Sequence, residues 1–162
     1  MNRTASWMAC LVVILLPGIV QAQFSIRAAS AEPVEGWQPM KVEHCRSRCV
    51  VWVAPTPALT ASDIEKAQPE VRADGYRIIR IVLTDAGASK LHDLMAAQLK
   101  KLVTLVVDDK VMWAPMVMYI IDPAWKETVL TGNTPTGLTP DEVERIMAIL
   151  RYSWLPQDYL EL

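Results

Sequence analysis

Residues 102–115, Leu-Val-Thr-Leu-Val-Val-Asp-Asp-Lys-Val-Met-Trp-Ala-Pro, are the most informative part of this sequence. An apolar, β-branched run precedes the two aspartates, and a second apolar run extends from Val111 to Ile120. Two such runs on either side of an Asp-rich turn predict an antiparallel β-hairpin. Pro115 has no backbone N–H to give to a neighbouring strand, so it predicts a sheet edge or a β-bulge at that position.

Further strands are expected on both sides of this hairpin. Residues 49–54 (Cys-Val-Val-Trp-Val-Ala) form a continuous apolar run that prolines follow. Residues 76–83 place isoleucines and a leucine at every second position, which is the period of a half-buried strand. Residues 128–131 (Thr-Val-Leu-Thr) form a short further strand before a glycine.

A repeated signal predicts the start of three helices. Three Leu-Thr pairs each place an apolar residue before a threonine that can cap a helix: Leu59-Thr60, Leu83-Thr84 and Leu138-Thr139. After Thr139, Pro140 and Glu142 complete a capping box. The leucines before Thr60 and Thr139 also have an apolar residue five positions later, which is the spacing of a hydrophobic staple. The order of elements predicts an α+β fold with about three helices on one face of a mostly antiparallel sheet.

The composition limits the class of protein. The chain has 162 residues, of which 52% are hydrophobic, and this is enough for one domain with a packed core. It carries 16 Lys and Arg against 18 Asp and Glu, a net charge of -2, whereas a nucleic-acid-binding protein needs a basic face. We therefore expect a globular domain that does not bind nucleic acid.

Residues 1–22 have the features of a cleavable signal peptide. Arg3 supplies a positive start, residues 7–20 are almost wholly apolar, and Ala22 ends a suitable cleavage site. A membrane anchor is the alternative, but this run is short against the roughly 20 residues that a spanning helix needs. Cys10 precedes the apolar stretch, which is the wrong order for a lipoprotein. We expect cleavage after Ala22, a periplasmic location and no remaining membrane anchor.

The rest of the chain divides into three parts. Residues 23–47 are rich in Ala, Ser, Glu and Pro and are expected to form a flexible leader that contains Cys45. Residues 48–152 form the predicted domain. Residues 153–162 make an aromatic, apolar tail, which either folds back over the core or recruits a partner.

The domain resembles a known family. The residues that carry the resemblance fall in five segments between about residues 48 and 151: 59–67, 80–91, 105–115, 129–132 and 139–150. They are similar to the head subdomain of the first periplasmic domain of SecD, an accessory subunit of the bacterial protein-export machinery. The hairpin with its Asp, Lys-Val and Ala-Pro is the most specific part. At Asp109 the family usually has glycine, so we expect aspartate to adopt a positive φ there at modest cost.

The resemblance implies an extracytoplasmic domain that contacts emerging polypeptide rather than an enzyme. No catalytic residues and no cofactor are assigned, because no hydrolase, phosphate-loop or metalloprotease motif is present. Our hypothesis is a non-enzymatic binding module, accessory to protein export, whose partner is extended polypeptide or an envelope or translocase component. The expected contact is a sheet edge, or the groove beside the hairpin near Trp113 and Pro115.

A Cys-x₃-Cys pair next to a histidine offers an alternative function. His44, Cys45 and Cys49 could bind copper or zinc through imidazole and thiolates. Outside the cytoplasm, however, two cysteines are usually bridged, so we expect a Cys45–Cys49 disulfide rather than a metal site.

Other candidate groups have simpler interpretations. Three methionines that fall on one face of the expected strand could hold Cu(I), but such a pattern is more often core filling: Met112, Met116 and Met118. His92 lies at the edge of a helical apolar stripe and is expected to face solvent. The aspartates at 108–109 are explained by the turn.

Overall fold

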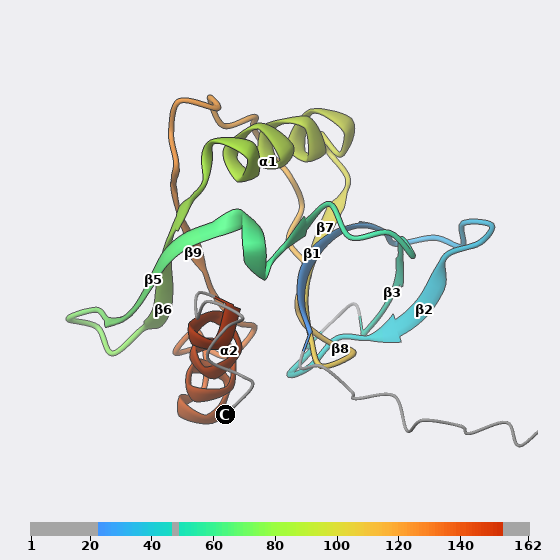
Figure 1. Cartoon of the computed structure of the whole chain (residues 1–162). Helices are drawn as coiled ribbons and strands as arrows, with labels where there is room; N and C mark the ends of the chain where they lie inside the picture. Colours follow the sequence, from blue (N-terminus) through green and yellow to red (C-terminus); the bar gives the residue numbers. More distant parts are fainter. Residues whose placement is uncertain (1–22, 47–48, 154–162) are drawn as a thin grey trace, which may run out of the picture.

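The structure is a computed structural model that describes residues 23–46 and 49–153. The predicted signal peptide (residues 1–22) and residues 154–162 of the predicted tail lie outside the described residues. Two sheets and two helices confirm the α+β class, and the pairs of named strands are antiparallel (Figure 1).

The first sheet curls until its two ends meet. Its strands follow the order β2-β3-β1-β7-β8, with β4 also paired to β1: β1 Phe24–Ser30, β2 Gln38–Lys41, β3 Val50–Val53, β4 Leu59–Thr60, β7 Leu102–Val107 and β8 Lys110–Trp113. Just after β2, Val42 bridges Val111 of β8, and the N–H of Glu43 donates to the Val111 carbonyl at 2.8 Å. The closed curl surrounds its own small apolar core, which includes Val51 and Val106.

The second sheet and the helices share a larger core with the first sheet. The sheet has the order β5-β6-β9, and the helices follow β6 and β9 along the chain: β5 Ile64–Val71, β6 Arg77–Leu83, β9 Glu127–Leu130, α1 Asp85–Ala97 and α2 Pro140–Ser153. Ile79, Ile81 and Leu83 on one face of β6 are fully buried, as their alternation predicts. They belong to a cluster that also includes side chains of β1, β7 and both helices.

The hairpin of residues 102–115 forms as predicted, with a shorter second arm. Val107 pairs with Lys110, and the two residues between them have positive φ, 47° at Asp108 and 61° at Asp109. Positive φ at both central residues is the geometry of a type I′ hairpin turn. Strand β8 ends at Trp113 and does not reach Ile120, because Pro115 cannot donate to the ladder.

The prediction of a flexible leader over residues 23–47 is wrong for residues 23–46, the part that the structure describes. Within this segment β1 lies in the middle of the curled sheet and pairs with β7 over six residues, from Phe24 with Val107 to Ala29 with Leu102. Phe24, Ile26 and Ala29 are buried. Only Phe24 and Ile26 are large apolar residues in β1, and the Ala and Ser residues that follow resemble a linker; the strand is stabilised by neighbours far along the chain.

The prediction of a helix after Thr60 is also wrong, so the described part of the chain has two long helices rather than three. Residues Ala61–Asp63 make one 3₁₀ turn, and the chain then enters β5. The segment instead pairs with β6 from Ile64 to Val71, and Pro69 would in addition be unfavourable in the interior of a helix. The other two starts are confirmed: Thr84 accepts from the N–H of Gly87 at 3.0 Å, and Thr139 exchanges hydrogen bonds with Glu142.

Candidate binding groove

An apolar groove of about 240 Å³ opens between the two sheets. One side is formed by β9, and the opposite side by β7, β8 and the start of the β8–β9 connection; side chains of α1 add to the lining. The lining includes Met95, Val103, Leu105, Trp113, Pro115 and Val129. Such a concave, mostly apolar surface is the usual form of a binding site.

Both residues expected to contact a partner lie in this groove. Trp113 is half-buried and packs against the main core. The carbonyl of Pro115 accepts a hydrogen bond from the N–H of Val103 at 3.0 Å, which holds the chain against β7 after β8 has ended. The proline therefore marks the point where the chain turns from sheet into groove wall.

Large apolar side chains are exposed along the rim of the groove. In the connection between β8 and β9, Met118 and Tyr119 line the groove with 69% and 68% of their surface exposed, and Trp125 farther along the connection is 73% exposed. Met116 is also exposed, so the expectation of core filling holds for Met112 alone. A local concentration of exposed apolar side chains is typical of an interaction surface.

Hydrogen bonds from the rest of the domain hold this connection in place. The carbonyl of Val117 accepts from the N–H of Lys100, and the N–H of Val117 donates to the carbonyl of Lys101, both at 2.8 Å. His92 on α1 makes a 2.8 Å hydrogen bond from Nδ1 to the carbonyl of Ile121. His92 is thus half-buried and engaged, not free in solvent as expected, and the groove wall is fixed at both ends.

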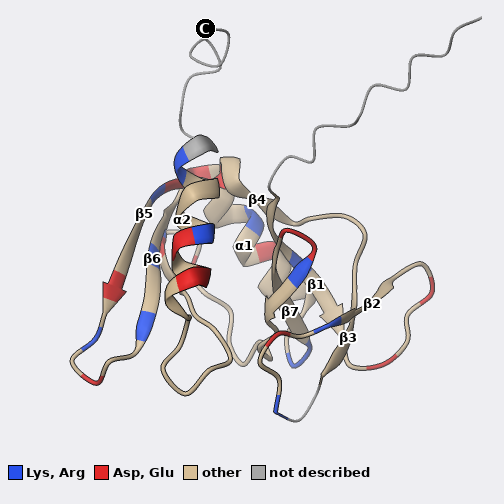
Figure 2. Cartoon of the chain, turned by 90° about the horizontal axis from the view of Figure 1, so that it is seen from below, with Lys and Arg blue, Asp and Glu red and all other residues tan. Residues whose placement is uncertain are grey.

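Among the described residues that line the groove there is no charged side chain, and charged residues outside the groove form ion pairs. Lys126 lies 2.6 Å from Asp85, and this hydrogen bond raises the pKa of the lysine above its ordinary value. On the outer face of the second sheet, Arg80 is 2.7 Å from Glu70, whose hydrogen bond raises the arginine pKa. Figure 2 shows basic and acidic residues interspersed along α2 and the β5–β6 hairpin.

The cysteine pair has a structural role. Cys45 and Cys49 form a disulfide with their Cα atoms 5.2 Å apart. Both sulfur atoms are therefore occupied and cannot act as thiolate ligands in this form. Among the residues that the structure describes, no three His, Cys, Asp or Glu side chains are placed to hold a metal ion. The copper or zinc alternative has no support in this arrangement.

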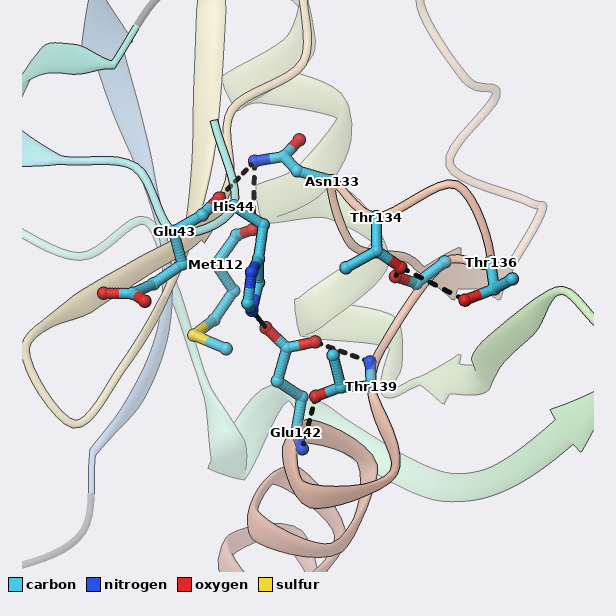
Figure 3. A network of polar contacts seen from close by, with 9 residues as sticks. Glu43, His44, Met112, Asn133, Thr134, Thr136, Thr139 and Glu142 are labelled. Atoms are coloured by element: carbon cyan, nitrogen blue, oxygen red, sulfur yellow. Dashed lines mark hydrogen bonds and ion pairs between the residues drawn. The ribbon is translucent and has the colours of Figure 1, made fainter. Parts of the chain in front are cut away.

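Polar contacts tie the disulfide loop to the start of α2 (Figure 3). His44 Nε2 lies 3.5 Å from Glu142 Oε1, while Glu142 Oε2 accepts from the N–H of Thr139 at 2.6 Å. The side-chain amide of Asn133 donates to the carbonyls of Glu43 and Met112 at 3.1 and 3.3 Å. These bonds fix the connection from β9 to α2 against the curled sheet.

The geometry of two paired sheets and two helices agrees with the sequence family that matches the chain. The family described as SecDF, P1 head subdomain, matches residues 39–157. This chain belongs to that family. The match begins nine residues before the domain boundary expected from the sequence, in agreement with the position of β2.

Solved SecDF structures share the fold. A crystal structure of SecDF in a super-membrane-facing form matches with a TM-score of 0.57 and 18% identity, over 82% of this chain and 19% of that chain. A SecDF structure described as a membrane component that enhances protein export matches with a TM-score of 0.58 and 17% identity, over 81% and 62%. This P1 head chain therefore corresponds to a part of those proteins. A comparison with curated protein sequences found no match.

The groove of this P1 head brings together residues that the sequence did not associate. Trp113 and Pro115 were located from the hairpin, but nothing linked them to Met95 of α1 or Val129 of β9. Only the separate strands and helices were visible in the sequence, and their proximity depends on long-range packing. The helices themselves are short: within residues 23–46 and 49–153, none is long and apolar enough to cross a membrane.

Proposed function

We propose that this P1 head is an extracytoplasmic, non-enzymatic module of protein export that holds extended polypeptide in the groove between its two sheets. Membership of the SecDF P1 head family supports a role in export, because one matched SecDF structure is described as enhancing protein export. The apolar residues 7–20 support delivery to the periplasm by a signal peptide.

The observation that carries the proposal is the combination of an apolar groove with a fixed, exposed apolar rim. Chains in an extended state present apolar side chains that a folded protein would bury, and burial of such surface on binding contributes about 25 cal/mol per Å². The groove supplies Trp113 from one wall and Met118 from the rim. Aromatic and methionine side chains are enriched at interfaces and adapt to varied partners.

A matched pair of variants tests this function. Met118 and Val71 are exposed to similar degrees, 69% and 65%, but Met118 lines the groove and Val71 lies at the end of β5. The binding of a fluorescently labelled, carboxymethylated, permanently unfolded protein is measured by anisotropy. Met118→Ser and Trp113→Ala are expected to weaken binding about tenfold, whereas Val71→Ser leaves it unchanged.

Two outcomes would contradict the proposal. One is that the wild-type protein shows no binding to the unfolded probe. The other is that Val71→Ser weakens binding as much as Met118→Ser, because the interaction would then be a general effect of exposed apolar side chains.

A further inference from the structure

The two edges of the β5-β6-β9 sheet are built differently. Strand β5 contains Pro69 and has a register shift between Ile64 and Lys66, and both features obstruct pairing with another strand. Strand β9 pairs with β6 without a register shift and contains no proline. The edge of β5 thus has two features that oppose an added strand, and the edge of β9 has neither of them.

The pairing shows which backbone groups of β9 face outward. The N–H of Leu83 donates to the carbonyl of Lys126, and hydrogen-bonded positions alternate along an antiparallel pair. The next positions that bond to β6 are therefore Thr128 and Leu130. The N–H and C=O groups of Glu127 and Val129 point away from β6, toward the free edge. Both residues are exposed, and Val129 also lines the groove.

We propose that the bound polypeptide adds to β9 as a fourth strand of the β5-β6-β9 sheet, with every second side chain in the groove. This inference rests on the proposed function and specifies how the groove binds its occupant. An extended backbone satisfies the outward groups of Glu127 and Val129 whatever its sequence, while alternate side chains reach the apolar lining beside Trp113.

Two lysines next to the groove wall indicate which segments bind best. Lys100 and Lys101 are both exposed, and their backbones hold Val117 of the groove wall. Within the described part of the chain neither ammonium group forms an ion pair. An acidic residue that flanks the apolar segment would meet these two lysines. The preferred occupant is therefore an extended segment of alternating apolar residues with a neighbouring aspartate or glutamate.

A proline substitution tests strand addition without removing the groove. Val129→Pro deletes the outward N–H of β9 but none of the hydrogen bonds to β6, so the sheet is expected to remain folded. The probe is a labelled peptide of alternating valine and threonine with glutamates at one end. Val129→Pro should weaken its binding about tenfold, while the control Val129→Ala weakens it less than about threefold. Circular dichroism and thermal unfolding verify that both variants fold.

Changes in the peptide supply a second measurement that does not depend on folding of a variant. N-methylation of alternate peptide residues on the side that faces β9 should reduce binding about tenfold, and methylation of the opposite set should not. Replacing the glutamates with lysines should reduce binding about two- to fivefold, and a Lys100→Ser/Lys101→Ser variant should abolish that difference.

The failure of this inference differs from the failure of the proposed function. If Met118→Ser abolishes binding while Val129→Pro and both methylation patterns have no effect, the groove binds polypeptide but strand addition is refuted. If the wild-type protein binds neither the peptide nor the unfolded protein, the proposed function itself is refuted.

Discussion

Two segments of this chain carry nearly the same helix-start signal and have different structures. Residues 59–64 (Leu-Thr-Ala-Ser-Asp-Ile) and 138–143 (Leu-Thr-Pro-Asp-Glu-Val) each place a leucine before threonine and an acid three residues later. In both, the carboxylate accepts a hydrogen bond from the threonine N–H, at 2.9 and 2.6 Å. The second segment begins a 14-residue helix, and the first makes one 3₁₀ turn followed by a strand.

A capping signal therefore starts a turn but does not decide whether a helix or a strand comes after it. After Asp63 the chain pairs with β6 over the whole of β5. The carboxylate of Asp63 accepts a hydrogen bond from the ammonium group of Lys90 on α1 at 2.7 Å. After Glu142 the apolar residues recur with helical spacing and bury one face of α2 in the core. The first turn is thus a corner between β4 and β5 that contacts α1. The second turn is the start of α2.

The greatest loss of stability is expected from the two staple leucines. Leu59 and Leu138 are both fully buried, so each change to alanine removes the same number of buried apolar atoms and leaves a cavity. Leu59→Ala and Leu138→Ala are each expected to reduce the free energy of unfolding by about 4 kcal/mol. Urea unfolding measures both. A loss below about 1 kcal/mol for Leu59→Ala would show that the first signal is only a surface turn.

The next largest loss of stability is expected when the contact between α1 and the first turn is disturbed. A side chain on Gly87 would meet the backbone oxygen of Asp63, which cannot move without disturbing the corner. Gly87→Ala is expected to destabilise the protein by about 3 kcal/mol. The control is Gly75→Ala. An added Cβ there has no neighbour within 4 Å, and only the positive φ of 80° adds a cost of about 1 kcal/mol. Equal losses would contradict the close contact.

The carboxylates of Asp63 and Glu142 are expected to contribute unequally to the stability of the protein. Both are buried, but Asp63 bonds to the Thr60 N–H and the Lys90 ammonium group, whereas Glu142 bonds to the Thr139 N–H and lies 3.5 Å from His44. Asp63→Ala should reduce the free energy of unfolding by about 2 kcal/mol and Glu142→Ala by about 1 kcal/mol. Thermal unfolding of the two variants measures the difference, and a larger loss for Glu142→Ala would reverse the comparison.

A proline substitution in β5, with little expected change in stability, separates local from long-range causes of this strand. If pairing with β6 decides the strand, Pro69→Ala should change the free energy of unfolding by no more than about 0.5 kcal/mol and leave the helical circular dichroism signal unchanged. The matched change Pro140→Ala at the start of α2 is the control. A gain of helical signal in Pro69→Ala would show that the proline alone prevents a helix.

Part of the groove could be predicted from the sequence, and the reason is local. Trp113 and Pro115 stand at the end of a hairpin whose two arms and turn are neighbours in the chain, so their position at an edge follows from nearby residues. Val129 and Met95 are exposed or half-buried members of a short strand and of α1, with no pattern that relates them to the hairpin. His92 was expected in solvent because its partner, the carbonyl of Ile121, is 29 residues away.

Local sequence was sufficient to predict the hairpin at 102–113 with its positive-φ aspartate, the start of α2 at Thr139 and the family. Each depends on residues within a few positions of one another, where steric and hydrogen-bonding preferences act directly. Long-range packing, in contrast, made Phe24–Ser30 a central strand, kept Ile64–Val71 from forming a helix and opened a groove beside β9. Those outcomes depend on pairing and burial between distant segments, and these can override local preference.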